Sequence, residues 1–396
     1  MKFINLKIRN QIYLNQDIRH LSKIMNTVII GGGIIGLSIG WQLAKKGVNV
    51  EILEKDKAGL SASRAAAGML APQAEMGFED IELFYLCRSS LDLFPRFTEE
   101  LYNDSGIKVE LERTGCILPG FDRDDAERLR RLYDFREKIG MPVLWLTGSE
   151  AREIEPFLSP RCTGAIWIED DAQINNRLLL DALKIAFVKC GGRLYEDHEV
   201  EEIIIEGDKV KGIKVHGTNL NFNNVVVAAG SWSKQIKGLP DNLLPPVRPV
   251  KGQIINLRLN DSCKISKVVR APDVYLLPKS DGRLIVGASV EEQGFDVNPT
   301  AGEIFRLLER GWEAVPSIYD LPIESIDVGL RPGSRDHMPI VGDSEVEGLY
   351  FATGHYRNGI LLTPVTAFEM AEWISTGNKS DVLKGFGIER FYKETV

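Results

Sequence analysis

The hydrophobic residues near the start of this chain form short, uninterrupted runs. Residues 27–30 (TVII) are followed by a glycine-rich turn, and residues 48–53 (VNVEIL) form a second such run. Aliphatic runs of this length are typical of strands that are buried on both faces of a parallel sheet. Between the two runs, Leu37 and Trp41 stand one helical turn apart, in a segment that stops at Gly47. The pattern therefore predicts a strand–helix–strand unit.

Further along the chain, hydrophobic residues recur either at helical spacing or in strand-like runs. Helical spacing predicts helices over residues 80–101, 129–139, 178–190, 302–312 and 358–376. Apolar or alternating runs predict strands over residues 108–118, from residue 164, and over residues 224–230, 247–259, 327–333 and 348–354. They also predict a hairpin of strands 199–205 and 210–215 around a turn at 207–208, and a pair of strands within 274–288 joined by a turn at 280–282. The run NVVVAAG (224–230) is expected to enter the parallel sheet beside the first strand. The alternation within 247–288 predicts an antiparallel sheet.

The chain has 396 residues, which is enough for two domains that each bury a core. We predict an α/β fold in which a Rossmann-like nucleotide-binding domain is discontinuous and an α+β domain with an antiparallel sheet is inserted into it. The predicted nucleotide-binding domain comprises residues 25–75, 150–246 and 327–396, and the second domain comprises residues 76–149 and 247–326.

Residues 1–24 precede the first predicted strand and carry more basic than acidic residues, without clear periodicity. Met25 would be a natural start of the folded part. We expect residues 1–24 to be a flexible N-terminal extension, or the product of an upstream start codon. A helix lying on a membrane surface is the alternative interpretation.

Three glycines spell G-x-G-x-x-G directly after the first predicted strand. Gly31 would allow the tight turn into the helix, Gly33 the close approach of a pyrophosphate, and Gly36 the close packing of helix on strand. The helix N-terminus offers free N–H groups and the positive end of its dipole to phosphates. Glu54 follows 18 residues after Gly36, where an acid accepts hydrogen bonds from the adenosine ribose. The unit predicts a dinucleotide site without separating FAD from NAD.

The composition narrows the classes of partner. A formal net charge of −8 argues against nucleic acid, which requires a basic surface. The 5 cysteines include no C-x-x-C pair and the 5 histidines lack metal-ligand spacing, so we expect a reducing, cytoplasmic location and no metal site. The uncharged run 27–44 is explained by the strand–turn–helix unit, so we expect no stable membrane insertion.

Two arginines stand near predicted strand ends in the last part of the chain. Arg331 is followed by Pro332 and Gly333, and Arg357 precedes a helix that is predicted to start near Gly359. A guanidinium can bind a carboxylate through two parallel hydrogen bonds, which makes both arginines candidates for an anion receptor. Surface salt bridges are the alternative. Tyr275, on the predicted antiparallel sheet, would either complete a carboxylate site or only pack.

Five segments resemble the D-amino-acid-oxidase family of FAD-dependent amine oxidases, and within it the glycine oxidases of bacterial thiamine synthesis. They are VIIGGGIIG (28–36), SRAAAGMLAPQAE (63–75), VYLLPKSDGRLIVGAS (274–289), GLRPGSRDHMPIVG (329–342) and FATGHYRNGILL (351–362). Their order and spacing match from residue 25 to about residue 391.

The resemblance implies a non-covalent, extended FAD whose AMP end lies at the glycine turn and Glu54. It assigns the isoalloxazine ring to residues 67–69 and 355–361, and the adenosine end to Ile174. The cofactor-binding residues that it implies are Gly31, Gly33, Ile34, Ile35, Gly36, Glu54, Lys55, Ala62, Ser63, Ala67, Gly68, Met69, Ile174, His355, Tyr356, Arg357, Asn358, Gly359, Ile360 and Leu361.

The resemblance also assigns the substrate site. Arg331 would be the main partner of the substrate carboxylate, helped by the Tyr275 hydroxyl and by Arg357. Asp273 stands where the glycine oxidases have a histidine, and Val290 replaces a methionine of the family. An acid at position 273 would weaken carboxylate binding or favour an amine-bearing side chain, so the preferred amino acid stays open.

The implied reaction is the FAD-dependent oxidative deamination of glycine or a small D- or N-methyl amino acid, in the service of thiamine biosynthesis. Its products are the imino or keto acid, ammonia or an amine, and hydrogen peroxide, and its partners are the amino acid and dioxygen. One alternative is a D-amino acid dehydrogenase that passes electrons to a quinone or carrier protein. A flavin-dependent step on tRNA and a binding protein without turnover are further alternatives. The oligomeric state stays open, with a homo-oligomer among the options.

Overall fold

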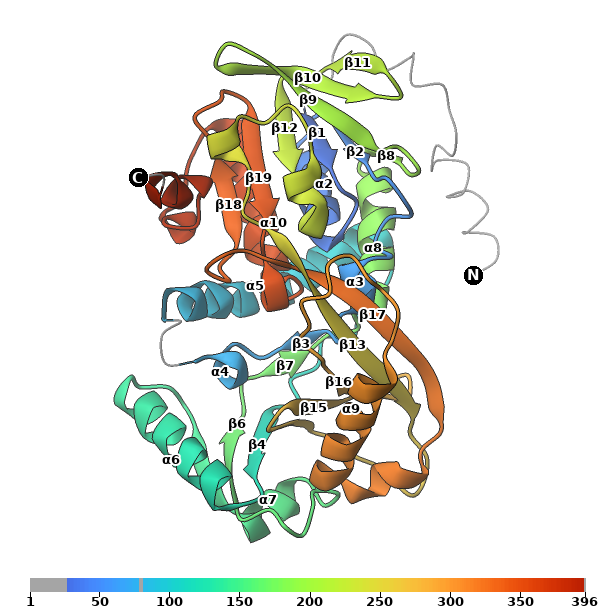
Figure 1. Cartoon of the computed structure of the whole chain (residues 1–396), viewed down its shortest axis with the longest axis vertical. Coiled ribbons are helices and arrows are strands. Elements are labelled where there is room, and N and C mark those ends of the chain that lie inside the picture. Colours follow the sequence, from blue (N-terminus) through green and yellow to red (C-terminus); the bar gives the residue numbers. More distant parts are fainter. Residues whose placement is uncertain (1–26, 78–80, 395–396) are drawn as a thin grey trace.

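The computed structural model describes residues 27–77 and 81–394, which form two halves connected by two long strands (Figure 1). The extension predicted for residues 1–24 lies outside the described residues. Within the described part of the chain, no helix combines the length and the apolar character needed to cross a bilayer.

The first half is built on a six-stranded sheet in the order β18-β19-β12-β1-β2-β8 (Figure 1). Its strands are β1 (Thr27–Ile30), β2 (Val50–Leu53), β8 (Arg193–Tyr195), β12 (Asn224–Val227), β18 (Ile340–Asp343) and β19 (Leu349–Thr353). Neighbouring strands are parallel except β18 and β19. Ile29 faces one hydrophobic cluster, whereas Val28 and Ile30 face another, so the sheet is covered on both sides. The predicted strand–helix–strand unit is confirmed, and so is the place of β12 beside β1.

Helices cover one face of this sheet. They are α2 (Ile34–Lys45), α5 (Ile81–Ser105), α8 (Asn176–Lys189) and α10 (Thr363–Thr376). α2 contacts α8 and α10, and α5 lies across the same two helices (Figure 1). In this layer the fully buried Trp41 ring of α2 meets Phe97 of α5 edge-on, with 5.2 Å between ring centroids. The other face carries the antiparallel sheet β11-β10-β9, formed by β9 (Val200–Glu206), β10 (Lys209–Val215) and β11 (Thr218–Asn221). The strands predicted over residues 199–205 and 210–215 are its β9 and β10, which pair as an antiparallel hairpin.

The second half is an eight-stranded sheet in the order β17-β13-β16-β15-β14-β4-β6-β5. Its strands are β4 (Cys116–Gly120), β5 (Leu144–Thr147), β6 (Gly164–Ile168), β13 (Arg248–Arg258), β14 (Val268–Ala271), β15 (Val274–Pro278), β16 (Arg283–Gly287) and β17 (Ile323–Gly333). All neighbours are antiparallel except β14 and β4. The predicted antiparallel sheet is thus confirmed.

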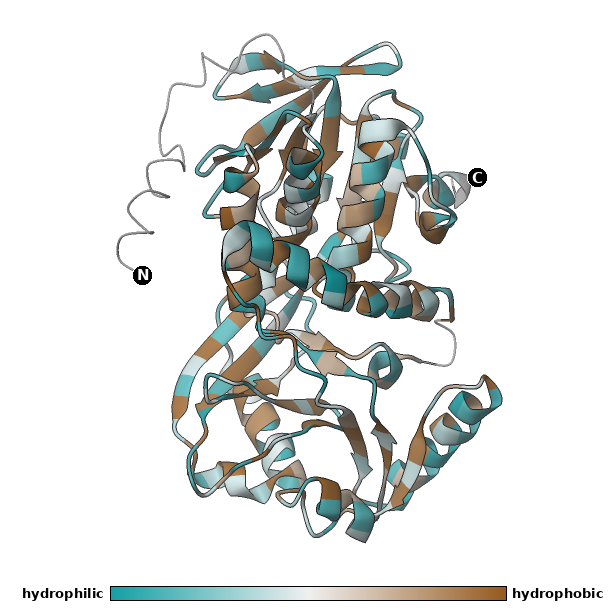
Figure 2. Cartoon of the chain, turned by 180° about the vertical axis from the view of Figure 1, so that it is seen from behind, coloured by the Kyte–Doolittle hydropathy of each residue, from teal (hydrophilic) through white to brown (hydrophobic). Residues whose placement is uncertain are grey.

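Three helices pack on this second sheet. They are α6 (Arg123–Lys138), α7 (Gly148–Ile154) and α9 (Ala301–Ala314). α9 contacts β13, β15 and β16, whereas α6 contacts β4 and β6. α6 buries only Leu129 and Arg136 and is largely hydrophilic, unlike the strands of the six-stranded sheet (Figure 2).

Short elements complete the fold. They are α3 (Ala62–Ala65), α4 (Pro72–Glu75), β3 (Met69–Leu70), β7 (Ala172–Gln173), η2 (Gly230–Gln235), η3 (Asp241–Leu243), η4 (Pro316–Asp320), η5 (Tyr356–Asn358), η6 (Asp381–Leu383) and η7 (Ile388–Glu394).

Four predicted placements differ from the structure. The strand at residue 164 was assigned to the nucleotide-binding domain, but β6 pairs with β4 and β5 in the eight-stranded sheet. α5 was assigned to the second domain, but its apolar stripe packs on α8 and α10. Within 108–118, regular strand begins only at Cys116. The last long helix begins at Thr363, with Pro364 in its first turn, because residues 359–362 form turns.

Candidate active site

A cavity of about 960 Å³ extends from the C-terminal end of β1 to the eight-stranded sheet. This volume lies at the upper end of the range for small-molecule sites. Twenty predicted site residues line the cavity, and the exceptions are Gly36 and Ile174. The two halves of the fold therefore bring together segments that are far apart in the sequence.

The glycine turn lines the end of the cavity where the sequence predicts a nucleotide, here called the nucleotide end. A Cβ atom on Gly36 would lie 2.0 Å from the carbonyl oxygen of Gly31, so no side chain fits between helix and turn. Gly36 therefore has the packing role that was predicted for it, behind the cavity wall. A Cβ atom on Gly33 would approach only the Ser63 hydroxyl, at 3.5 Å, which leaves the backbone of the turn open to the cavity.

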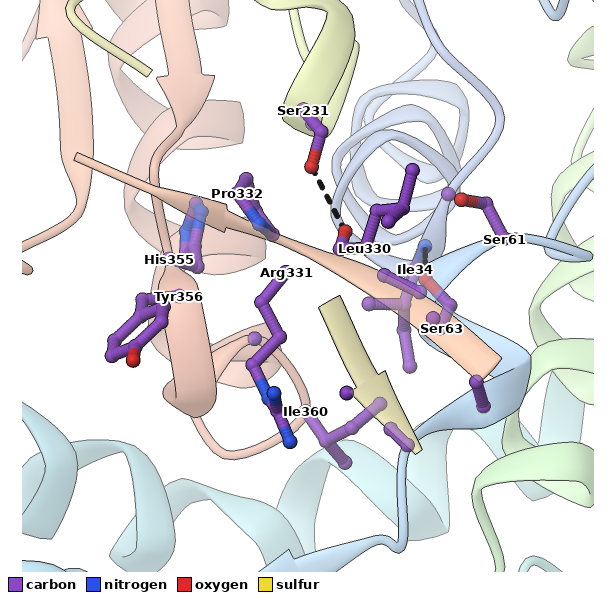
Figure 3. Close-up of a pocket in the computed structure, with 18 of the residues that line it drawn as sticks. Ile34, Ser61, Ser63, Ser231, Leu330, Arg331, Pro332, His355, Tyr356 and Ile360 are labelled. Carbon is purple, nitrogen blue, oxygen red and sulfur yellow. Dashed lines mark hydrogen bonds between the residues drawn. The ribbon is translucent and has the colours of Figure 1, made fainter. Parts of the chain in front are cut away.

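The start of α2 offers backbone donors to this end of the cavity. Its first residue, Ile34, donates its N–H to the Ser63 hydroxyl at 3.0 Å (Figure 3). Ile34 and Ile35 both line the cavity. Like any helix N-terminus, this one favours negative charge through its dipole and its remaining free N–H groups.

Glu54 is held at the end of β2 by two backbone amides. Its carboxylate oxygens accept hydrogen bonds from the N–H of Gly32 at 2.8 Å and from the N–H of Asp56 at 3.0 Å. Burial raises the pKa of Glu54, and the same two amides oppose that rise. Beside it, the Lys55 ammonium lies 4.0 Å from the centre of the Trp232 ring.

Ile174 does not line the cavity, contrary to the expectation that it meets the adenosine end of the cofactor. Ile174 is completely buried in the core, where its N–H donates to the Gly68 carbonyl at 2.8 Å and its carbonyl accepts from Lys279 Nζ at 2.9 Å. The reason is the pairing of β3 with β7, which places Ile174 behind the cavity wall. The residue that lines the nucleotide end is instead Val200, together with His198.

Sequence reasoning missed Val200 and His198 because their place depends on a tertiary contact. The His198 N–H donates to the Glu54 carbonyl at 2.8 Å, which brings the start of β9 to the end of β2. The strand–turn pattern before β9 was a usable signal. Because β8 pairs with β2, the residues that follow β8 must lie near the end of β2.

Arg331 lies near the C-terminal end of β17, opposite Val250 of β13, as the predicted strand over residues 327–333 implies. Its Nη1 donates to the Ser289 carbonyl at 3.0 Å and to the Lys251 carbonyl at 3.4 Å. A Cβ atom on Gly252 would lie 2.3 Å from Nη1, so the guanidinium occupies space that this glycine leaves free. Burial lowers the pKa of Arg331. In Figure 3 its side chain extends from β17 toward Ile360.

Tyr275 of β15 faces the same end of the cavity. A Cβ atom on Gly287, its partner on β16, would lie 2.5 Å from the Tyr275 hydroxyl oxygen. Burial raises the pKa of Tyr275 to about 12, opposed by the charge of Arg331. Tyr275 therefore remains a neutral hydroxyl group that can donate a hydrogen bond.

His355 and Arg357 border the cavity on the segment between β19 and α10. His355 is buried, its Nε2 lies 3.1 Å from the Thr366 hydroxyl, and burial lowers its pKa to about 3. Its imidazole is therefore neutral at physiological pH. Arg357 is exposed, with its guanidinium carbon 5.1 Å from the centre of the Tyr356 ring.

The end of the cavity at Arg331 and Tyr275, where the resemblance predicts the substrate, is here called the substrate end, and its outer part is charged. Asp273 and Val290, the two departures from the family pattern, both line the cavity and are exposed. Next to them Arg270 Nε lies 3.3 Å from the Glu75 carboxylate. Among the described residues, no cluster of histidine, cysteine and acidic side chains could hold a metal ion.

Comparisons with known proteins agree with this architecture. The family model for FAD dependent oxidoreductases (DAO) matches residues 26–373. A glycine oxidase of Geobacillus kaustophilus (strain HTA426) is 36% identical over 367 residues, which cover 92% of this chain and 97% of that protein. The crystal structure of a glycine oxidase from Geobacillus kaustophilus superimposes with a TM-score of 0.86 at 36% identity, covering 92% of this chain and 98% of that one.

Two further relatives widen the comparison. The bifunctional protein ThiO/ThiG of Trichormus variabilis (strain ATCC 29413 / PCC 7937) is 33% identical over 371 residues, which cover 93% of this chain but only 55% of that protein. The chain thus spans about half the length of this relative. An L-proline dehydrogenase from P. horikoshii shares the fold, with a TM-score of 0.80 at 23% identity, over 93% of this chain and 98% of that one. On the family match and these identities, the chain belongs to the DAO family of FAD-dependent oxidoreductases, and FAD is its cofactor.

Proposed function

We propose that this enzyme oxidises glycine or another small D- or N-methyl amino acid. A hydride leaves the α-carbon and a proton leaves the amine nitrogen, which together remove two electrons and two protons, and water converts the resulting imino acid into the keto acid and ammonia or an amine. Dioxygen takes up the two electrons and two protons and leaves as hydrogen peroxide. The observation that carries the proposal is the Arg331 guanidinium, which lines the cavity and whose Nε and Nη2 have no partner among the described residues. The identity to glycine oxidases supports it further.

The nucleotide end fits the AMP and pyrophosphate parts of FAD. The open backbone at Gly33 and the start of α2 would receive the pyrophosphate, because free N–H groups there favour phosphate oxygens. Glu54, already aligned by two amides, would accept the ribose hydroxyls. Segments 67–69 and 355–361 would flank the isoalloxazine ring, and Val200, which lines the cavity, would take the adenosine role that the resemblance implied for Ile174.

At the substrate end, Arg331 and Tyr275 would together bind the carboxylate. The guanidinium supplies charge and two parallel donors, which fix the direction of the bound group. The Tyr275 hydroxyl stays protonated because its pKa is about 12, so it donates a third hydrogen bond. Arg357 is exposed, so we expect a weaker contribution from it.

The residues of the site would act by orientation. The isoalloxazine ring of FAD supplies the acceptor for the hydride that leaves the α-carbon. Arg331 and Tyr275 would hold the carboxylate so that the α-carbon faces that ring. The loss of entropy on aligning the substrate is then offset by the free energy of binding, before the reaction begins. His355 is a poor candidate for the base that takes a proton from the amine, because burial lowers its pKa to about 3 and its Nε2 lies within hydrogen-bond distance of the Thr366 hydroxyl.

A role in thiamine biosynthesis is part of the proposal. It is supported by the similarity to the ThiO/ThiG relative and to the glycine oxidases. A strain without this gene should then need thiamine or a product of the oxidation for growth. Growth that is independent of both would contradict this role while leaving the reaction itself untouched.

The reaction is tested by adding glycine, sarcosine, D-proline and D-alanine to the FAD-loaded enzyme without oxygen. Loss of the flavin absorbance near 450 nm, on the order of full bleaching with at least one of them, is the expected result. Hydrogen peroxide should then form in air with the same amino acid. Bleaching without peroxide would favour the dehydrogenase that uses a quinone or carrier protein, and bleaching by none of the four would refute the proposal.

A further inference from the structure

Lys251 on β13 carries a charge into the protein interior. Its side chain is 0% exposed, and its ammonium lies 2.5 Å from Asp296 Oδ2 and donates to the Asn298 carbonyl at 2.5 Å. Both partners belong to residues 289–299, the segment between β16 and α9, which we call the strap. Burying an ammonium is costly unless good hydrogen bonds compensate for its lost hydration. The contact therefore fixes the strap firmly to β13.

A second buried side chain anchors the strap two residues further along β13. Gln253 Nε2 donates to Glu291 Oε1 of the strap at 2.8 Å. Gln253 also holds Thr300, the residue directly after the strap, because its Nε2 donates to the Thr300 hydroxyl at 3.0 Å and its Oε1 accepts from the Thr300 N–H at 2.9 Å. Residues two apart on a strand share one face, so Lys251 and Gln253 hold the strap from the same side. The strap is thus tied near both of its ends.

The same two segments fix the guanidinium of Arg331. Nη1 donates to the carbonyl of Ser289, the first residue of the strap, and to the carbonyl of Lys251 itself. Between these points, the backbones of Lys251 and Glu291 exchange hydrogen bonds of 2.9 and 3.0 Å. A shift of the strap would therefore move one of the two acceptors that orient Arg331.

The strap also forms part of the cavity wall. Val290 and Val297 line the cavity. Phe295 lies against Trp232 of η2, with 5.4 Å between the ring centroids, and so connects the strap to the nucleotide-binding half. The position of the strap therefore affects the shape of the cavity as well as the orientation of Arg331.

We propose that Lys251 is a positioning residue for substrate binding. Its ammonium holds the strap in place, and the strap and β13 together set the angle at which Arg331 presents Nε and Nη2 to the cavity. The proposal rests on the proposed role of Arg331 in binding the substrate carboxylate. Lys251 itself does not line the cavity, so its effect passes through Arg331.

Two variants and one control test the proposal in the FAD-loaded enzyme. Lys251→Met removes the ammonium at similar length, and Asp296→Asn weakens the same contact from the partner, whose side chain is 39% exposed. Lys209→Met is the control, because it breaks the exposed Lys209–Glu347 pair of 2.6 Å on β10. For each protein, the dissociation constant of acetate is measured from the flavin spectrum, and the limiting rate of anaerobic flavin reduction is measured with the best amino acid.

The two variants should bind acetate more weakly, by about tenfold for Lys251→Met and about threefold for Asp296→Asn. The FAD content should stay within about twofold of the native value, because neither residue lines the cavity, and the limiting rate of reduction should fall by no more than acetate binding does. Hydrogen exchange over residues 289–299 should become faster in both variants. Lys209→Met should match the native enzyme in every measurement.

Two results would contradict the proposal. Unchanged acetate binding in both variants contradicts it even if exchange over the strap becomes faster. A large fall in the limiting rate with unchanged acetate binding also contradicts it. Should Lys251→Met fail to fold, Asp296→Asn decides alone. If the native enzyme binds acetate and both variants bind it equally well, only this inference is overturned. If the native enzyme responds neither to acetate nor to any amino acid, the proposed function is overturned as well.

Discussion

The two ends of the cavity are built in different ways. The nucleotide end is centred on one short stretch, residues 31–36 with Glu54, where backbone amides and missing side chains shape the cavity wall. The substrate end gathers side chains from β13, β15 and β17, and the contact between Arg331 and Lys251 joins residues 80 positions apart. The comparison teaches that one end is fixed by backbone geometry, whereas the other depends on individual side chains. Members of one family can therefore share a cofactor and differ in substrate.

The largest expected effect comes from the nucleotide end. In Gly36→Val, the new Cβ atom would lie 2.0 Å from the Gly31 carbonyl oxygen, so helix and turn must separate. We expect loss of bound FAD and a free energy of unfolding that is lower by about 3 kcal/mol. Gly302→Ala is the control, because its new methyl group would meet nothing within 4 Å at the start of α9. FAD content and chemical denaturation measure both effects, and a Gly36→Val protein that keeps its flavin would break the comparison.

The second prediction concerns Arg331. Arg331→Leu should keep FAD but raise KM for the amino acid by roughly a hundredfold or more, since a buried charge-assisted contact is lost. Arg331→Lys should recover part of the loss, because it keeps the charge without the planar fork. Steady-state kinetics and the flavin spectrum check the two parts. If Arg331→Leu retained the native KM, the carboxylate assignment would be wrong.

The third prediction uses the buried imidazole of His355. Its pKa is about 3 in the folded protein, below the ordinary value of 6.5, so the unfolded chain takes up a proton first as pH falls. Stability is therefore fully present above about pH 6.5 and is lost toward pH 3, by up to about 1.4 kcal/mol per pH unit. His355→Gln should lack this contribution. Denaturation of both proteins between pH 7 and pH 5 measures the difference, and parallel curves would contradict the prediction.

The smallest effect is expected for Tyr275. Tyr275→Phe removes one neutral hydroxyl group and should weaken substrate binding by about threefold to tenfold. Because the pKa of Tyr275 is about 12, the native enzyme should show no loss of binding from its ionisation up to pH 10. Substrate affinity across pH in both proteins measures this. If the Tyr275→Phe variant bound substrate as tightly as the native enzyme, the Tyr275 hydroxyl would have no role in binding the carboxylate.

The same contrast explains what the sequence could predict. The strand–glycine–helix–strand unit was predictable because its physics is local: an apolar run, three glycines and an acid in about thirty residues. Ile174 was misplaced and Val200 missed because the pairing of β3 with β7 and of β2 with β8 decides which residue reaches the nucleotide end. Local patterns carry no information on such pairings.

At the substrate end, the sequence predicted residue types but not their settings. Arg331 and Tyr275 were singled out, and the strand that carries Arg331 was predicted, but the orientation of its guanidinium depends on Gly252 and on Ser289. The buried Lys251 contact was also invisible, because a lysine in an alternating strand is expected to face solvent. Long-range strand register decides these points.

The central claim is that Arg331 and Tyr275 bind a carboxylate in a cavity whose other end holds FAD. The most direct measurement is a crystal structure of the FAD-bound enzyme with acetate. The account predicts an acetate carboxylate within about 3 Å of Arg331 Nε or Nη2 and of the Tyr275 hydroxyl, on the flavin side of β17. A flavin-bound structure in which acetate binds elsewhere, or in which Arg331 turns away from the cavity, would contradict it.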